Sequence, residues 1–170
     1  MRLYSGKVPT IAGEIVKTLT EQSDIETGSG REVQADIEAV LNQYLRTEKE
    51  AGDKAKDAMQ SRGIPPTDFS RMRKLAAEQM GIKVGDETID YLLDQILEIL
   101  MHSANVDEIF AEDVELRRKM APILKRHMAV DEELEQEVRG KLKHVQEGTR
   151  TWEVEYNRMM EDIRRRKGLG

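Results

Sequence analysis

The chain has 170 residues, of which 38% are hydrophobic, 4% aromatic and 35% charged. This balance suits amphipathic helices with one solvated face better than a deep globular core. The formal charge of −6 argues against bulk attraction to nucleic acid or anionic membrane but allows a local basic patch. The absence of cysteine excludes disulfides, thiolate metal sites and cysteine nucleophiles. No apolar run approaches the roughly 18 residues of a membrane span and no secretory signal is evident, so we expect a soluble cytoplasmic protein.

Apolar spacing predicts four helices in the first half of the chain. The first runs from about Pro9 to Gln22, because proline is tolerated in the first turn of a helix, and the second from about Arg31 to Arg46. Thr47-Glu48-Lys49-Glu50 fits a capping box, which predicts that a third helix begins there. The turn Gly63-Ile64-Pro65-Pro66-Thr67 precedes a fourth helix from about Asp68 to Met80. The side chains expected on the inner faces of the third and fourth helices are Ala51, Ala55, Met59, Phe69, Met72, Ala76 and Met80.

The most apolar stretch, Leu92 to Met101, predicts the helix that opens the second half of the chain. Ile99 and Met101 widen the apolar surface of this helix beyond that of the first helix, so we expect it to be buried on more than one side. If they were exposed instead, they would be the best candidates for a partner-binding surface. Its main apolar positions repeat the spacing of the first helix: Leu92, Ile96, Leu97 and Leu100 match Ile11, Ile15, Val16 and Leu19.

The remaining helices of the second half are predicted from the same spacing. Pro122 predicts a kink or a helix start, because proline removes a backbone hydrogen bond and clashes with the preceding turn. The next helix has Glu135/Arg139 and Glu137/Lys141 at the spacing of ion pairs on its outer face. The inner-face positions expected of the last two helices are Leu134, Val138, Leu142, Val145, Trp152, Tyr156, Met159 and Ile163.

The matching spacings continue through the chain at offsets of 81, 83 and then 87 residues. The offset changes only at predicted loops, as a tandem duplication with loop insertions predicts. The predicted fold is therefore all-α, with two roughly four-helix modules, residues 1–82 and 83–170, packed as one pseudo-twofold bundle about the two opening helices. Convergence is the alternative interpretation, since any two generic amphipathic helices can be aligned somehow.

No catalytic or metal-binding motif is evident. None of the three histidines follows the Glu-x-x-His spacing of di-iron bundles. Asp94, Glu98 and His102 share one helix face, but it lies away from the apolar stripe, so we expect a solvated surface. His127 takes the place of Tyr44 in the repeat and is expected to be a partly buried, amphipathic side chain. We therefore expect no catalytic, cofactor-binding or metal-binding residue and no enzymatic activity.

Cations recur on the two predicted fourth helices and their C-terminal ends. One interpretation is a surface for nucleic acid or another acidic partner. The simpler interpretation is a solvated helix face, on which cations pair with acids one turn away and oppose the helix dipole. Arg71 and Arg158 in particular are expected to form ion pairs within their own modules. The candidate interaction residues are Arg71, Arg73, Lys74, Arg158, Arg164, Arg165, Arg166 and Lys167.

Two segments carry a family resemblance. The opening Met1-Arg2-Leu3-Tyr4-Ser5-Gly6-Lys7-Val8-Pro9-Thr10-Ile11-Ala12-Gly13-Glu14-Ile15-Val16, followed by Asp24-Ile25-Glu26, resembles the start of a bacterial family known as domain of unknown function 507. Arg158-Met159, with the basic, glycine-ended tail, resembles the close of that family's unit. The resemblance implies a cytoplasmic bacterial protein with a helical fold, and it brings no activity, cofactor or catalytic residue.

These observations favour a non-catalytic interaction or scaffold protein, which binds a protein partner or itself. The repeat, the thin core and the missing catalytic groups motivate this hypothesis. The alternative is a nucleic-acid- or ribosome-associated factor that uses the basic fourth helices and the tail from Arg164 to Lys167. An enzyme is the third and least favoured class.

Overall fold

The computed structural model describes residues 2–146 and 149–169, without the side chains of Asp131 and Glu132. Its helices and strands are, in chain order, α1 (Val8–Glu21), β1 (Ile25–Glu26), α2 (Gly30–Arg62), α3 (Phe69–Gln79), α4 (Thr88–His102), β2 (Glu108–Ile109), α5 (Asp113–Met128), α6 (Val130–Lys141) and α7 (Arg150–Arg166). Short 3₁₀ turns at Ser5–Lys7, Pro66–Asp68 and Gly85–Glu87 precede α1, α3 and α4. Among the described residues, no helix combines the length and the apolar character needed to span a membrane.

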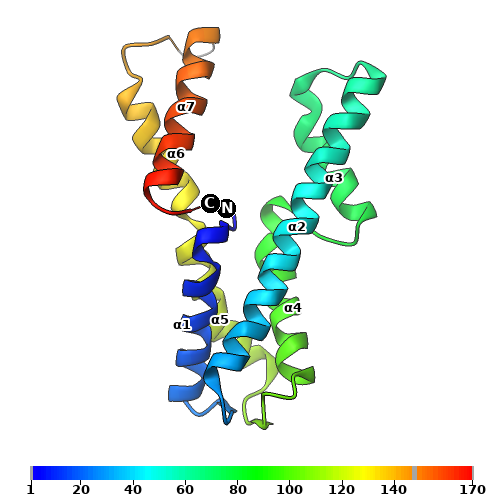
Figure 1. The fold of residues 1–170 in the computed structure, drawn as a ribbon, viewed down its shortest axis with the longest axis vertical. Helices are drawn as coiled ribbons and strands as arrows, with labels where there is room; N and C mark the ends of the chain where they lie inside the picture. Colours follow the sequence, from blue (N-terminus) through cyan, green and yellow to red (C-terminus); the bar gives the residue numbers. More distant parts are fainter. Residues whose placement is uncertain (1, 147–148, 170) are drawn as a thin grey trace.

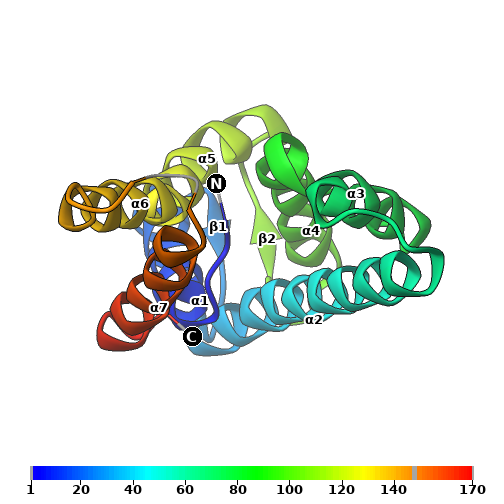
Figure 2. The same cartoon turned by 90° about the horizontal axis from the view of Figure 1, so that it is seen from above.

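The molecule has a helical base and two arms (Figure 1). The base contains α1, α4, α5 and the first half of α2. The second half of α2 and α3 form one arm, which we call the α3 arm, and α6 and α7 form the other, the α7 arm. Figure 2 shows the two arms separated when the molecule is seen from above. Near the two ends of the chain, Gly6 and Leu169 lie side by side, where the α7 arm joins the base.

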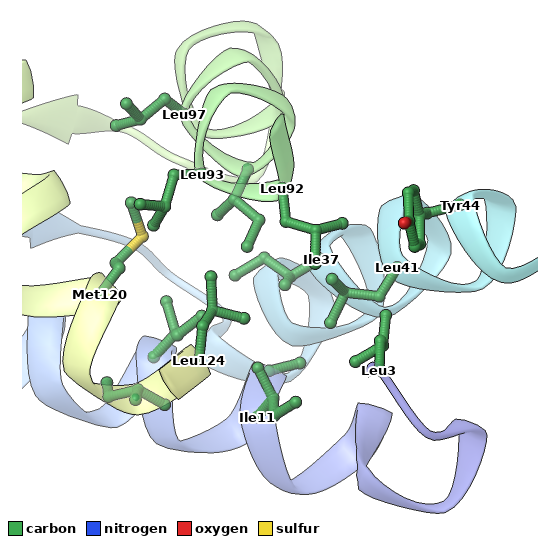
Figure 3. Close-up of a cluster of buried hydrophobic side chains, with 14 of the residues drawn as sticks. Leu3, Ile11, Ile37, Leu41, Tyr44, Leu92, Leu93, Leu97, Met120 and Leu124 are labelled. Carbon is green, nitrogen blue, oxygen red and sulfur yellow. The ribbon is translucent and has the colours of Figure 1, made fainter. Parts of the chain in front are cut away.

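The base has one hydrophobic core, to which both halves of the sequence contribute. α1 packs against α2 and α5, and α4 packs against the same two helices. The short strands pair antiparallel, with Ile25 opposite Ile109, and so join the loop after α1 to the loop after α4. Residues drawn in Figure 3 come from the N-terminal segment and from all four base helices; those it labels are Leu3, Ile11, Ile37, Leu41, Tyr44, Leu92, Leu93, Leu97, Met120 and Leu124.

The predicted helix break at Thr47 is wrong, because α2 runs unbroken for 33 residues. The Thr47 hydroxyl donates to the Gln43 carbonyl at 3.0 Å, which is the bond of a threonine inside a helix rather than at its start. The helix instead begins after Ser29, whose hydroxyl accepts from the Glu32 amide. It ends at Gly63, whose φ of 64° is the left-handed conformation of a C-terminal cap. The first half therefore has three α-helices rather than four.

The inner faces of the α3 arm are only partly as predicted. On α2, Ala51, Ala55 and Met59 are buried as expected. On α3 only Ala77 is buried, and it was not predicted. This short helix packs mainly against α2, so its predicted inner face is only half-buried. The residues of that face are Phe69, Met72, Ala76 and Met80.

Pro122 lies inside α5, so of the two predicted alternatives the helix start at this residue is wrong, and the kink stays a prediction. Pro122 has no N–H to donate to the Arg118 carbonyl one turn earlier in the helix. Both residues are exposed, so water can satisfy that carbonyl. On α6 the predicted ion pairs are confirmed, with Arg139 3.1 Å from Glu135 and Lys141 3.5 Å from Glu137.

The α7 arm has a small hydrophobic core of its own, and the N-terminal segment joins it to the base. Leu3 is buried in the base core, while the next residue, Tyr4, is buried among Leu134, Ile163 and Leu169 of the arm. The Gly6 amide donates to the Leu169 carbonyl at 3.0 Å. We call these contacts between the N-terminal segment and residues 168–169 the terminal clasp.

The terminal clasp requires glycine at position 6. A Cβ atom on Gly6 would lie 1.6 Å from the Gly168 carbonyl oxygen, far closer than any atoms can approach. Gly168 itself has a φ of 64°, which lets the chain turn back toward Gly6 after α7. The opening motif therefore serves as a structural attachment for the α7 arm.

Candidate partner-binding groove

The predicted interaction cations are divided between the two arms. Arg71 and Arg158 form the expected ion pairs, at 3.5 Å from Asp68 and 2.7 Å from Glu155. Two of the tail cations are also paired, Arg165 with Glu161 at 3.6 Å and Lys167 with Glu137 at 3.7 Å. Lys74 and Arg166 are exposed. These cations match the interpretation of a solvated helix face better than that of one continuous basic patch.

Arg164 and Arg73 differ from the rest because both are half-buried. The guanidinium carbon of Arg164 lies 5.7 Å from the centre of the Tyr4 ring, so this residue belongs to the terminal clasp. Arg73 lines a cavity at the foot of the α3 arm.

His127 and Arg126 bridge α5 to Glu14 on α1. The His127 Nε2 atom is 2.7 Å from Glu14 Oε2, and Arg126 pairs with the other carboxylate oxygen. Burial alone would raise the pKa of Glu14, but the hydrogen bonds from His127 and Arg126 outweigh it and hold that pKa below its ordinary value. His127 is half-buried, as predicted, with 14% of its side chain exposed. The three residues close the outer edge between α1 and α5.

The acidic face of α4 is solvated, as predicted. Asp94, Glu98 and His102 are all exposed, and Asp94 forms an ion pair with Arg117 of α5. In the part of the chain that the structure describes, no group of three histidine, aspartate or glutamate side chains is placed to hold a metal ion.

A groove of about 300 Å³ lies between α2 and α4. Its lining is mostly apolar and, among the residues that the structure describes, includes one carboxylate, Asp36, but no lysine or arginine. The two helices run antiparallel, because Asp36 near the start of α2 accepts a hydrogen bond from Asn105, just beyond the end of α4, at 2.9 Å. The lining residues that shape the groove are Ala39, Val40, Tyr44, Tyr91, Gln95 and Ile99.

Two tyrosines form the aromatic end of the groove. The Tyr44 hydroxyl donates to the Lys83 carbonyl at 2.9 Å, and the Tyr91 ring packs at 5.7 Å between ring centres. Burial raises the pKa of Tyr44, so the phenol stays neutral and keeps this hydrogen bond. Burial also raises the pKa of Tyr91, with the charge of Glu98 as the second cause. Both phenols at this end of the groove are therefore neutral at neutral pH.

Ile99 and Met101, which the sequence analysis singled out, lie on different faces of α4. Ile99 is half-buried and lines the groove, whereas Met101 is 50% exposed. The prediction that both widen the buried face is wrong for Met101, because residues two apart are separated by about 200° around a helix. Only Ile99 therefore contributes to the candidate site.

Sequence reasoning identified the apolar character of α2 and α4 but missed the groove between them. Ala39, Val40 and Tyr91 carry no sequence signal of a shared groove, because the antiparallel packing of α2 on α4 is not visible in a linear pattern. The neutral pair Gln43 and Gln95 also gave no signal, although both line the groove.

Comparison with known proteins places the chain in a family. Residues 1–169 match the family described as "Protein of unknown function (DUF507)". No curated protein matches the sequence. The match covers the base and both arms, including the terminal clasp formed by the opening motif and residues 168–169. The chain therefore belongs to the DUF507 family.

Proposed function

We propose that the protein is a non-catalytic interaction protein, which binds an amphipathic helix of a protein partner in the groove between α2 and α4. The observation that carries this proposal is the open, mostly apolar lining of the groove. The other helix pair of the base, α1 and α5, has its outer edge bridged by the ion pairs of Glu14 with Arg126 and His127. An apolar edge left without such a bridge is typical of a surface that a partner covers.

The dimensions of the groove suit a short helix. Its lining runs from Asp36 to Thr47 on α2 and from Tyr91 to Ile99 on α4. At about 1.5 Å per residue, these stretches are roughly 12 to 16 Å long, enough for about two to three helical turns of a partner. Leucine-sized side chains at three- and four-residue spacing would fill the apolar lining.

The charges around the groove favour a partner helix with basic flanks. Asp36 lies in the lining, and the carboxylate of Glu98 lies close enough to Tyr91 to affect its pKa. No cation of the described chain lines the groove to oppose a basic partner. Electrostatic complementarity of this kind sets orientation and association rate more than affinity.

We also infer that the two halves, residues 1–82 and 83–170, descend from one duplicated module. Gly81 and Gly168 both adopt left-handed conformations at the end of a helical arm, with φ of 79° and 64°. Each is followed by a buried apolar residue, Ile82 or Leu169. Ile82 leads directly toward α4, while Leu169 bonds to Gly6 just before α1, so each arm ends beside an opening helix. A duplication explains why one chain has two versions of one helix pair.

The bacterial cytoplasmic setting that the family resemblance implies stays a prediction.

A pair of matched variants tests the proposed groove. Ala39 and Ala35 are both exposed on α2, but only Ala39 lines the groove. Used as baits in the native organism, the wild type and Ala35→Arg should retain the same protein, and Ala39→Arg should lose it because its side chain occupies the groove. Cross-linking should then place a basic amphipathic helix of the retained protein beside Gln95. Equal retention by all three baits would contradict the proposal.

The same purification separates the other interpretations. A second copy of this chain as the occupant would show as a dimer in solution mass measurements that Ala39→Arg converts to a monomer. Nucleic acid recovered at low salt, and lost when Arg165 and Arg166 are replaced by glutamine, would instead support binding through the basic tail.

A further inference from the structure

A second cavity, of about 510 Å³, lies at the foot of the α3 arm, where α2 and α3 face the N-terminal segment. It shares no lining residue with the groove between α2 and α4. Four cationic side chains line it, Arg2, Lys49, Lys56 and Arg73, against two acidic ones. The cavity is thus locally basic on a protein whose formal charge is −6.

The cations of this cavity differ from most others on the arms. Arg71, Arg139, Arg158 and Arg165 each have a carboxylate one helical turn away as an ion-pair partner. The four cations of the cavity form no ion pair with any carboxylate of the described residues. Their charges are therefore available to an anionic ligand.

An aromatic ring lies beside the cations. Phe69, at the start of α3, is half-buried in the wall of the cavity, and the Lys56 ammonium lies 5.7 Å from the centre of its ring. Lys49 and Lys56 are two helical turns apart on α2, which is about 10 Å along the helix axis, and Arg73 lies on α3. A row of cations next to an aromatic face is the combination that single-stranded nucleic acid requires, because phosphates recur along its backbone and each base can stack.

We propose that this cavity binds single-stranded nucleic acid, with phosphates on Lys49, Lys56, Arg73 and Arg2 and a base against Phe69. The proposal is independent of the protein-binding groove and uses only one of the cations that the sequence analysis named, Arg73. An acidic protein segment is the other class of anion that the cations would accept. The ring of Phe69 favours nucleic acid, because an acidic peptide gains little from stacking.

The test is the fluorescence anisotropy of a labelled oligouridylate of about 12 nucleotides, titrated with the full chain at about 50 and 200 mM salt. Binding should weaken steeply with salt. The variant Lys49→Gln/Lys56→Gln/Arg73→Gln should weaken binding by about tenfold or more and lower the salt slope by roughly one for each phosphate that is no longer neutralised. Helical circular dichroism and thermal melting verify that each variant is folded.

The matched control is Lys54→Gln/Arg62→Gln/Lys74→Gln. It removes the same charge from the same two helices, but none of its residues lines the cavity. It should change affinity by less than about threefold, since these exposed charges lie outside the cavity and are screened by salt. An equal loss in the control, or no binding by the wild type, would overturn the proposal.

Two further variants test the chemistry of the site. Asp53 lines the cavity without an ion pair in the described chain, so Asp53→Asn should tighten oligouridylate binding. Phe69→Leu should weaken it by about fivefold or more, the lower end of the loss seen when a stacked base is removed. If polyglutamate competes as well as unlabelled oligouridylate and Phe69→Leu has no effect, the site recognises only negative charge. The assignment to nucleic acid is then wrong.

Discussion

The α1/α5 and α2/α4 helix pairs flank one core but close their outer edges differently. Between α1 and α5, Glu14 holds both Arg126 and His127. Under the proposed duplication, with offsets of 81 and 83, the counterparts of these three residues are Gln95, Gln43 and Tyr44, which line the open groove between α2 and α4. The backbone arrangement alone therefore does not create the groove. It opens where neutral side chains replace a charged bridge.

The two arms show a second difference, this one between the first and second halves of the chain. α2 continues from the base into the α3 arm without a break, so that arm is part of the base helix itself. α5 ends at Met128 and α6 begins at Val130, and the α7 arm instead depends on the terminal clasp. The α3 arm is thus attached by a continuous helix, and the α7 arm by contacts that a single substitution can disrupt.

The core under the two helix pairs should respond equally to truncation. Leu41 on α2 and Leu124 on α5 are both fully buried (Figure 3) and are counterparts at the offset of 83. Leu41→Ala and Leu124→Ala should each lower the free energy of unfolding by about 2–5 kcal/mol, because each leaves a cavity in the core. Urea denaturation measures both. A loss below about 1 kcal/mol in one of them would show that the pairs differ in the core and not only at the edge.

Gly6→Ala should detach the α7 arm while leaving the base folded. The added Cβ cannot coexist with the Gly168 carbonyl at 1.6 Å, so we expect a loss of about 1–3 kcal/mol. Trp152 is the only tryptophan and lies on α7, so its fluorescence in urea reports this arm while far-ultraviolet circular dichroism reports all helices. The two signals should coincide in the wild type and separate in the variant.

Gly52→Ala is the control: it is the same substitution on α2, the helix that continues from the base into the α3 arm. Gly52 lies inside α2, and apart from the backbone of its own helix no described atom lies within 4 Å of the added methyl group. Alanine there should raise stability by about 0.5–1 kcal/mol, since glycine is the poorer helix former. Coincident signals in Gly6→Ala would contradict the role assigned to the clasp.

The sequence was sufficient for what depends on local periodicity. Ile11, Ile15 and Leu19 on α1, and the ion pair of Glu135 with Arg139 on α6, lie where their spacing placed them. The false break at Thr47 has a physical reason: a hydroxyl followed by glutamates fits a helix start, but Tyr44 and Ala51 continue the buried face through it. At Thr47 the local capping signal favours a helix start, whereas burial of the inner face favours one continuous helix. Burial is the stronger effect.

The candidate sites depend on packing between distant segments, which periodicity does not show. The groove requires α2 and α4 to lie side by side, and the basic cavity requires Arg2 to approach Lys49 and Arg73. The pairing of Ile25 with Ile109 was likewise missed, because two-residue strands have no alternation to detect. The opening motif was noticed only as a family resemblance, and its structural role became evident from the position of Gly168.

Transferring the charged bridge should close the groove. Gln43→Arg/Gln95→Glu places at the α2/α4 edge the two charges that Arg126 and Glu14 supply at the other. A partly exposed pair of this kind is worth at most about 1 kcal/mol, so stability measured in urea should change little. Binding of the partner retained by the wild type should be lost. Gln43→Arg alone is the control and should weaken it less, because without the glutamate the arginine is not held across the groove.

The smallest effect is the pH dependence of the bridge between α1 and α5. Glu14→Gln removes the charge that His127 and Arg126 stabilise and should cost about 1 kcal/mol or less near neutral pH. Because the pKa of Glu14 in the folded protein lies below its ordinary value of 4.5, the unfolded chain takes up this proton first as the pH falls. The difference in unfolding free energy between the wild type and Glu14→Gln should therefore shrink as the pH falls below about 5. A difference that grows as the pH falls, in urea titrations at several pH values, would show that the bridge does not favour the charged carboxylate. The contrast between the two helix pairs would then lie in packing rather than in charge.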